Sequence, residues 1–542
     1  MITVLPSVMP EMTPTLPAIA ALVRSGAVDR GWALFEAGGF LQRGDDPAAL
    51  AVKGRLLKAR GRLAGESQRR QLLAEAAAAY GAAHGLSPAP YLAINAASLS
   101  LLAGDPAAAE AGARAVLALL DAPEPPADTP YFLAATRAEA LLLLSDCEGA
   151  EAALDQAVQY DPDGWDDRAT TLTQLREVLA AQGQDSAWLN RYTPPASLHF
   201  AGHMGLASGG SAEAELARQL AGTVPPGRYG FAWGALAAGA DIVIAEHLLA
   251  ADAQLHVVLP CPVEQFEAQS VAPTGPQWTE RFRALLPQAA SLRIAATGTG
   301  SAHDPLATAH AGELAIGGAL NNASRLGSSA AQLIVTDEHG GGANTARQAA
   351  LWRGDLGTQM RLTLPRDAAV EKLFPPEAPD PARALALHVA VGLDGVAGAE
   401  QPSSEQITTL IAPVAAVLAA LPAGSVRAGP GLWEFAATDL DLALSVIARL
   451  LSISPAPPAI GAHLAISTLV KDPASGTLVP YGPAPDLARQ LQQLAPAGLA
   501  LASDALAVTL AARPPGALRS ELYLPDEDEL GGAIHALLAR NQ

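Results

Sequence analysis

Three glycine-rich turns with polar neighbours are the strongest chemical signal in this sequence. Glycine lets backbone amides approach an anion, and the N-terminus of a following helix adds a favourable dipole. Together the turns are predicted to bind a phosphate or diphosphate group, although each alone could be purely structural in a chain so rich in Ala and Gly. The glycines concerned are Gly202 and Gly205, then Gly234 and Gly239, then Gly341 and Gly342.

Several polar residues near these turns are candidate ligand contacts, each with a structural alternative. Asp241 would bind a ribose hydroxyl or cap its own helix. His203 would touch the ligand or hold a turn. Arg281 would neutralise a phosphate or pair with the adjacent Glu280 on the surface. Thr345 closes the third turn and completes the predicted ligand-binding set.

One residue pair and two cysteines carry weaker signals. Glu246 and His247 follow Asp241 by about one helical turn, so one of them could face the ligand, with a solvated helix face as the alternative. Cys147 and Cys261 are far apart in sequence, which excludes a disulfide framework or a Cys-rich zinc site and suits a reducing cytosol. The residues therefore predict no catalytic set, no metal site and no cofactor.

Length and charge limit the classes of function. A chain of 542 residues should hold three or four domains at ~100–200 residues each. The 34 basic and 54 acidic residues give a net charge of −20, which argues against binding to nucleic acids or anionic membranes. The N-terminus lacks the pattern of a secretory signal, and no long apolar run suggests a membrane span. We therefore expect a cytoplasmic protein.

The elements that must position these residues change along the chain. Residues 1–195 are Ala- and Leu-rich with apolar positions at helical spacing, broken by turns such as Gly104-Asp105-Pro106. The spacing predicts helix-pair repeats of roughly 34 residues, of the tetratricopeptide type, which bind protein partners on a concave face.

Strand-length apolar runs alternate with helical stretches over residues 196–368, which predicts a doubly wound parallel sheet of Rossmann-like type, interrupted by a Gly-rich stretch. The glycine turns then fall at the carboxyl ends of strands, the usual ligand position in such folds. A Pro-rich linker at 369–382 precedes a third domain at 383–525. That domain reads as strand, helix, apolar turn, helix and strand, and 526–542 reads as an acidic and helical tail.

The central domain resembles the Rossmann-like SLOG superfamily over about 196–366. Gly234, Gly239 and Asp241 match its Gly-x-x-x-Gly-x-Asp pattern, followed by the strand Leu255-His256-Val257-Val258-Leu259-Pro260. The resemblance implies sensing or processing of a nucleotide-derived ligand. The phosphoribohydrolase motif of the group is only approximated by Gly341-Gly342-Ala343-Asn344-Thr345, and it lacks the catalytic Glu.

The third domain resembles class III adenylate and guanylate cyclases over about 383–512. The matching segments are Ala459 to Leu464, Asp472 to Thr477, Leu487-Ala488-Arg489 and Leu501 to Asp504. The resemblance implies an α+β, ferredoxin-like domain with a strand, a hairpin, a helix and a strand in that order.

The catalytic positions of this resemblance are occupied by unsuitable residues. Class III cyclases hold two divalent ions with two aspartates, but Val389 and Pro430 stand at those positions and cannot bind magnesium. The transition-state Asn and Arg fall at Asp486 and Gln490. The resemblance therefore implies an inactive domain, either kept for pairing as a homodimer or a remnant that only packs. A residual cyclase is the further alternative.

A shorter resemblance covers the helical region. Tyr91-Leu92-Ala93-Ile94-Asn95-Ala96-Ala97 followed by Gly104-Asp105 looks like the TRAF-binding, tetratricopeptide-bearing regulatory region beside apoptosis signal-regulating kinases. Bacterial relatives of that region carry SLOG and cyclase modules, so the resemblance implies a bacterial signalling scaffold.

These inferences predict a multidomain signalling scaffold that senses a nucleotide-derived small molecule in its central domain. It would contact protein partners through the helical repeats and pair through an inactive cyclase-like domain. One alternative is a nucleotide-processing enzyme with Asp241 or Glu246 as the base. Another is a pure protein-interaction module.

Overall fold

The computed structural model divides the chain into two compact units, Met1–Thr193 and Pro194–Gln542. The boundary falls within two residues of the predicted end of the helical region. The second unit holds both predicted sheet domains. Among the described residues, no helix has the length and apolar character needed to cross a membrane. The structure describes residues 15–123, 127–296, 301–374, 377–393, 404–422, 424–429, 431–454, 456–473, 476, 478–527 and 532–540.

The described part of the first unit is helical throughout, as predicted. Most of its helices begin with a capping Asp or Thr, a proline in the first turn, or both. Proline is tolerated in the first turn because the N–H that it lacks would have no partner within the helix there. The pairs α5–α6 and α7–α8 confirm the predicted helix pairs, while their tetratricopeptide assignment stays a prediction. The helices are α1 (Leu16–Arg24), α2 (Val28–Ala37), α3 (Pro47–Leu63), α4 (Glu66–Leu86), α5 (Pro90–Ala103), α6 (Pro106–Leu120), α7 (Pro130–Leu143), α8 (Cys147–Tyr160) and α9 (Trp165–Ala181).

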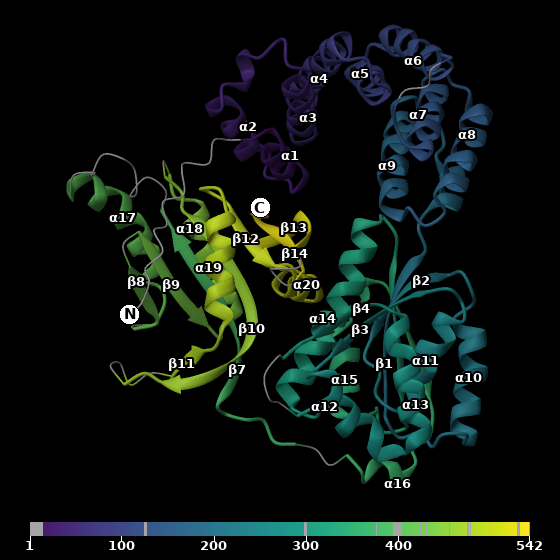
Figure 1. The fold of residues 1–542 in the computed structure, drawn as a ribbon, viewed down its shortest axis with the longest axis vertical. Coiled ribbons are helices and arrows are strands. Elements are labelled where there is room, and N and C mark those ends of the chain that lie inside the picture. Colours follow the sequence, from purple (N-terminus) through teal and green to yellow (C-terminus); the bar gives the residue numbers. More distant parts are fainter. Residues whose placement is uncertain are drawn as a thin grey trace. The chain divides into compact units, whose positions relative to one another are not determined.

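A six-stranded parallel sheet opens the second unit, which confirms the predicted parallel sheet (Figure 1). Its strand order is β4-β3-β2-β1-β5-β6, so the order reverses between β1 and β5 and leaves a crevice at their carboxyl ends. The strands are β1 (Ala196–Gly202), β2 (Tyr229–Gly234), β3 (Gln254–Leu259), β4 (Ala289–Ile294), β5 (Ala330–Thr336) and β6 (Thr358–Thr363).

Helices cover both faces of this sheet. On one face α10 (Ser211–Thr223), α11 (Ala240–Leu249) and α13 (Pro276–Leu285) share a core with the strands that includes Phe200 and Trp278. On the other face lie α14 (Pro305–Arg325) and α15 (Ala343–Leu351). The Gly-rich interruption expected before residue 330 is wrong in part, because β4 and α14 lie there. Short helices α12 (Val263–Phe266) and α16 (Ala368–Glu371) complete the region.

The second sheet is mostly antiparallel and has the order β13-β14-β12-β10-β7-β9-β8, with β11 beside β10. The predicted order of strand, hairpin, helix and strand over 459–503 is confirmed by β10, β11, α19 and β12. The elements are β7 (Arg383–Gly392), α17 (Ser404–Leu418), β8 (Val426–Gly429), β9 (Leu432–Ala437), α18 (Leu440–Leu451), β10 (Ala459–Lys471), β11 (Leu478–Tyr481), α19 (Ala484–Leu494), β12 (Ala500–Ser503), α20 (Asp504–Ala512), β13 (Leu518–Glu527) and β14 (Gly532–Ala539).

Two predictions about this sheet are wrong. The apolar turn expected between the first two helices is the hairpin β8–β9, and the helical tail expected at 526–542 contains strand β14. Periodicity cannot separate a short apolar strand from a helical turn, and here pairing decides. β14 lies between β12 and β13 and hydrogen-bonds to both, which satisfies its backbone on each side.

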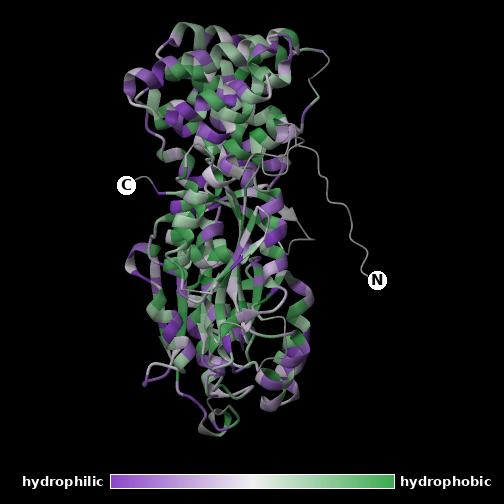
Figure 2. Cartoon of the chain, turned by 90° about the vertical axis from the view of Figure 1, so that its left-hand side faces the viewer, coloured by the Kyte–Doolittle hydropathy of each residue, from purple (hydrophilic) through white to green (hydrophobic). Residues whose placement is uncertain are grey.

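The two sheets share helices and therefore a common interior. α14 packs against α20, where Gly317 lies so close to Val508 that an added Cβ would overlap its carbonyl oxygen (Figure 1). Val508 forms one apolar cluster with Leu314 and Val258 of β3. The predicted 369–382 linker thus joins two sheet layers of one compact unit. Figure 2 shows hydrophobic residues gathered along the strands and hydrophilic ones on outward helix surfaces.

Candidate functional site

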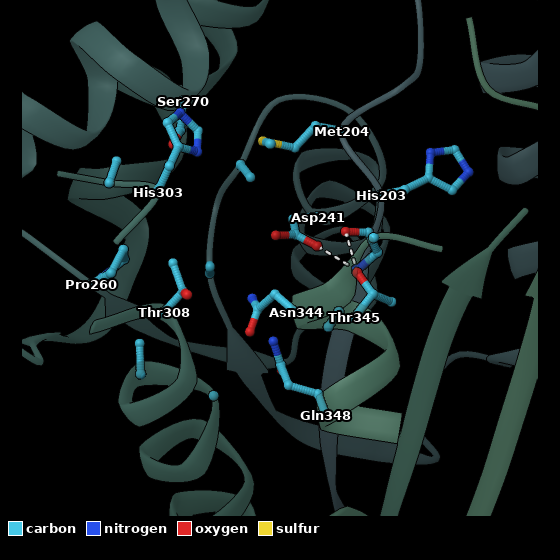
Figure 3. Close-up of a pocket in the computed structure, with 18 of the residues that line it drawn as sticks. His203, Met204, Asp241, Pro260, Ser270, His303, Thr308, Asn344, Thr345 and Gln348 are labelled. Atoms are coloured by element: carbon cyan, nitrogen blue, oxygen red, sulfur yellow. Dashed lines mark hydrogen bonds between the residues drawn. The ribbon is translucent and has the colours of Figure 1, made fainter. Parts of the chain in front are cut away.

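A cavity of about 730 Å³ lies at the carboxyl ends of the parallel strands, beside the point where the strand order reverses. That is the position where ligands bind in open parallel sheets, and the volume is within the usual range for small-molecule sites. Figure 3 shows His203, after β1, and Thr345 of α15 on one side, with Pro260, after β3, and Thr308 of α14 on the other. The polar residues lining it are His203, Asp241, Ser270, His303, Thr308, Asn344, Thr345, Arg347, Gln348, Arg366 and Glu377.

Gly202, the last residue of β1, is where the predicted residues meet. Its N–H donates to Asp241 Oδ1 at 2.8 Å, and its carbonyl accepts from Thr345 Oγ1 at 3.3 Å (Figure 3). An added Cβ would overlap Ala240, so glycine permits this approach of strand and helix. Residues predicted from three separate turns therefore converge on one backbone unit.

Asp241 is part of this junction and is only 6% exposed. Burial raises its pKa to about 7, against the opposing effect of the N–H groups of Gly202 and Ala237. The helix-cap alternative is wrong, because Gly239 is the N-cap residue of α11 and adopts a positive φ of 108° that disfavours other residues. Asp241 instead ties the start of α11 to the end of β1.

The third turn is organised by Asp337, which follows β5. Its Oδ1 accepts from the N–H of Gly341 at 2.9 Å and of His339 at 2.8 Å, and Arg366 Nε lies 2.6 Å from Oδ2. Burial alone would raise the pKa of Asp337, but these N–H groups and Arg366 hold it below its ordinary value. The loop thereby presents the N-terminus of α15, at Gly342 to Thr345, to the cavity.

His203 lines the cavity but its ring serves the loop. Nδ1 accepts from Gly205 N–H at 3.3 Å, and Nε2 lies 3.3 Å from the Leu364 carbonyl oxygen. In Figure 3 the ring points away from Asp241 and Asn344. The imidazole of His203 therefore holds the turn, which was the structural alternative for this residue. Gly205 lies against Arg366 at the same edge of the cavity.

Four of the predicted residues do not line the cavity. Gly234 contacts the Phe200 ring, and Gly239 and Gly341 shape their turns. Arg281 is held elsewhere, since its guanidinium bonds to Glu246 at 2.8 Å and to Glu213 at 2.7 Å. The phosphate-binding role predicted for Arg281 is not supported by this placement.

The partners of Arg281 bear on the enzyme alternative. Glu246 is engaged by Arg281 outside the cavity, so Asp241 is the only one of the two predicted bases that lines it. His247 is also turned elsewhere, with Nε2 2.9 Å from the Val224 carbonyl oxygen.

Sequence reasoning missed the wall that α14 contributes. Thr308 and Gly312 of this helix and His303 before it line the cavity, and so do Asn344 and Gln348 of α15. Asp304 caps α14 with Pro305 in its first turn, a helix-start signal that was available in the sequence. Below the cavity Gln348 Oε1 lies 2.9 Å from His199 Nε2, and burial lowers the pKa of His199 to about 4.

Of the predicted cyclase positions, Val389 lies in β7 of the second sheet, and Asp486 and Gln490 lie in α19. Val389 is 2% exposed and belongs to the apolar core, opposite Phe435 and Ala462 on neighbouring strands. Asp486 accepts from Arg489 Nη1 at 2.7 Å, and Gln490 is exposed one turn further along α19. Pro430 lies outside the described residues. Within the described ranges, no three or more His, Cys, Asp or Glu side chains are grouped to hold a metal ion.

Comparison with known proteins gives limited similarity. No protein-family description matches the sequence, and no curated protein matches it. Among solved structures, a double mutant of the guanylyl cyclase domain of the RhoGC fusion protein from the aquatic fungus Blastocladiella emersonii is 11% identical. The match covers 30% of this chain and 98% of that one, with a TM-score of 0.23.

Two further structures are similar at the same low level. The adenylyl cyclase CyaB from P. aeruginosa is 12% identical over 30% of this chain and 95% of its own, with a TM-score of 0.23. Thermobaculum terrenum O-GlcNAc transferase is 13% identical over 58% of this chain and 59% of its own, with a TM-score of 0.18. Cyclase domains thus resemble about 30% of the chain, and TM-scores this low carry no functional argument.

Proposed function

We propose that this protein is a signalling scaffold that senses a nucleotide-derived small molecule in the cavity beside Gly202. The observation that carries the proposal is the position of that cavity, at the reversal of strand order and in front of the α15 N-terminus. Backbone N–H groups at a helix N-terminus favour an anionic group. The resemblance to SLOG domains supports a nucleotide as its source.

The cavity wall offers separate surfaces for the parts of such a ligand. Arg347 and Arg366 stand near the glycine turn and would balance phosphate charge. Phe266, Pro260 and Phe374 form an apolar section that suits a base. The Asp241 carboxylate already accepts the N–H of Gly202, so we assign Asp241 to positioning the β1 turn.

The flanking regions would then transmit the binding event. The second sheet would pair with another copy instead of catalysing, because Val389 fills the core where a metal-binding aspartate would stand. The helical unit would contact protein partners. Such a division suits a cytoplasmic regulator.

The proposal is tested by calorimetric titration of the full chain with a panel of adenine and guanine mono-, di- and cyclic nucleotides. Asn344→Asp places a carboxylate at the start of α15, which the helix dipole tolerates but a phosphate would not. We expect at least tenfold weaker binding for this variant. Asn190→Asp, the same change at an exposed site in the helical unit, should bind as the wild type does. No binding by any panel member would refute the proposal.

A nucleotide-processing enzyme is a second candidate, favoured by one observation. Asp241 lines the cavity with a pKa raised to about 7, which suits a group that exchanges protons near neutral pH. Chromatography after incubation with the same nucleotides would detect a released base or phosphate. Loss of such a product in Asp241→Asn would support the enzyme, and intact nucleotides with the wild type would exclude it.

A further inference from the structure

A second cavity, of about 350 Å³, lies between α14 and the second sheet. His310 and Glu313 of α14 form one wall, and Leu387 of β7 and Leu464 of β10 form the opposite one. Arg347 of α15 and Arg513, just after α20, enter from the sides. Asp439 and Asp441 lie at the exposed edge. The cavity is at the lower end of the size range for small-molecule sites.

Two buried nitrogen atoms at this cavity lack partners. His310 is 2% exposed, and neither its buried Nδ1 nor the buried Nε of Arg513 has a hydrogen-bond partner among the described residues. Burial, with Arg293 and Arg513 nearby, lowers the pKa of His310 to about 3, so the ring is neutral. An unsatisfied buried polar group costs about 1–3 kcal/mol, so such groups are usually found with a partner.

Two guanidinium groups and one carboxylate meet in the inner part of the cavity. Glu313 is nearly buried, and each of its carboxylate oxygens forms an ion pair with one arginine. The distance is 3.4 Å both from Oε1 to Arg347 Nη2 and from Oε2 to Arg513 Nη2. These are long for charge-assisted hydrogen bonds, which favour about 2.7–2.9 Å. Glu313 is met only by the Nη2 atom of each guanidinium group, so Arg513 Nε is left without an acceptor in the described part of the chain. Asp439 and Asp441 lie further out, at the exposed edge of the cavity, where Asp439 Oδ1 accepts from Leu442 N–H as the cap of α18.

We propose that this second cavity binds a small oxyanion, a carboxylate or phosphate group, between Arg513, Arg347 and His310. An oxyanion supplies acceptors for Arg513 Nε and for the imidazole N–H, the two buried groups here that lack a partner within the described ranges. The apolar wall of Leu387 and Leu464 leaves room for only a short carbon skeleton beside it. The ligand class is therefore a small acid or phosphate ester.

Arg347 connects this cavity with the first one, because it lines both. An anion that pairs with Arg347 in one cavity makes this guanidinium group less available to an anion in the other cavity. Occupancy of the two cavities is then linked, and the linkage acts in both directions. The site itself does not depend on the proposed function, since it rests on Arg513 and His310, which do not line the first cavity.

The test is equilibrium dialysis of the full chain with radiolabelled inorganic phosphate and, separately, succinate, at fixed ionic strength. We expect saturable binding of at least one probe that Arg513→Gln weakens at least tenfold. His310→Phe, which removes the imidazole nitrogens, should weaken it by a smaller factor. Arg519→Gln, a matched change at an arginine outside this cavity, should leave it unchanged.

The outcomes separate this site from the nucleotide cavity. Asn344→Asp should weaken binding at the first cavity at least tenfold while the component sensitive to Arg513→Gln persists. Phosphate binding without succinate binding would identify a phosphate source, and the reverse a carboxylate source. Absence of saturable binding of both probes, or binding that Arg513→Gln and His310→Phe leave unchanged, would overturn the proposal whatever the nucleotide titration gives.

Discussion

At the scale of residues, the junction around Gly202 explains how the site is held. Both polar backbone groups of Gly202 are satisfied by side chains from the first turns of two helices, Asp241 of α11 and Thr345 of α15. A strand end in a parallel sheet otherwise leaves such groups to water or ligand. The carboxyl of Asp241 is therefore a structural group placed beside a binding cavity, and its titration should be visible in stability.

Asp241 gives a pH-dependent prediction. Its pKa is about 7 in the folded protein and near 3.8 when unfolded, so between these values the folded state holds a proton that the unfolded state has lost. Stability from this group is then greatest below pH 4 and falls as pH rises towards 7, by up to about 4 kcal/mol. Asp241→Asn should lack this component. In guanidinium unfolding at pH 5 and at pH 8, the free energy of unfolding of the variant should rise relative to that of the wild type as the pH increases. A difference in unfolding free energy that is the same at both pH values would contradict this.

Val389 provides a test of the metal-binding position that the resemblance to cyclases predicts. Val389→Asp places a carboxylate at this position, but it also buries an unpaired charge in the core beside Phe435. We expect a loss of several kcal/mol in stability and no cyclic nucleotide from ATP or GTP with magnesium. Val470→Asp, at a position 43% exposed in the same sheet, should cost about 0.5 kcal/mol or less. Cyclic nucleotide formation by Val389→Asp would show that the site needs only this group.

At the scale of elements, α14 lies between the two sheets of the second unit. It contacts strands of the parallel sheet on one side and α20 on the other, and it lines both cavities. Its glycines permit this, with Gly318 against the Trp233 ring and Gly317 against the Val508 backbone. Small residues at both contacts let the neighbouring elements approach closely.

Gly317 gives a prediction about this contact. Gly317→Ala adds one methyl group where it would overlap the Val508 carbonyl, so α14 and α20 must separate. We expect a loss of about 1–3 kcal/mol in the stability of the second unit, measured by thermal or urea unfolding. Gly222→Ala is the control, because its added methyl meets nothing within 4 Å and α10 should gain about 0.5–1 kcal/mol. Equal effects of the two substitutions would disprove the packing argument.

At the scale of the whole molecule, the chain divides into two compact units, and the second unit holds both sheets. Arg293 of β4 pairs with Asp504 of α20, which also accepts from His535, and Arg383 at the start of β7 pairs with Asp304 before α14. These side-chain contacts and the apolar clusters between α14 and α20 join the two sheets. Cutting between the sheets would expose that shared interior.

Truncation tests this organisation. Residues 194–542 should fold alone as a cooperative unit, because the boundary falls between compact units. Residues 194–376 and 377–542 expressed separately should bind a hydrophobic dye and aggregate, since Val508 and Leu314 lose their cover. Circular dichroism, dye fluorescence and gel filtration give the comparison. Two well-folded, soluble halves would show that the linker separates true domains.

The sequence by itself determined the local elements and the first part of the site. Helical spacing identified the first unit as helical and located α5, α6, α7 and α8, and apolar runs identified the parallel strands β1, β2, β3, β5 and β6. The glycine turns placed Gly202, Asp241 and Thr345 near one another because strand ends of a parallel sheet meet at one edge. These features are short-range, so neighbouring residues suffice to encode them.

Only the tertiary structure decided which elements share an interior. α14 is apolar and small on nearly all sides, so its sequence lacks the amphipathic pattern that marks a surface helix. β14 is a strand because β12 and β13 lie on either side of it. Arg281 was predicted to contact a phosphate, but it forms ion pairs with Glu246 and Glu213, which are distant in sequence. In each case the deciding partner is far along the chain, and local residue patterns do not record it.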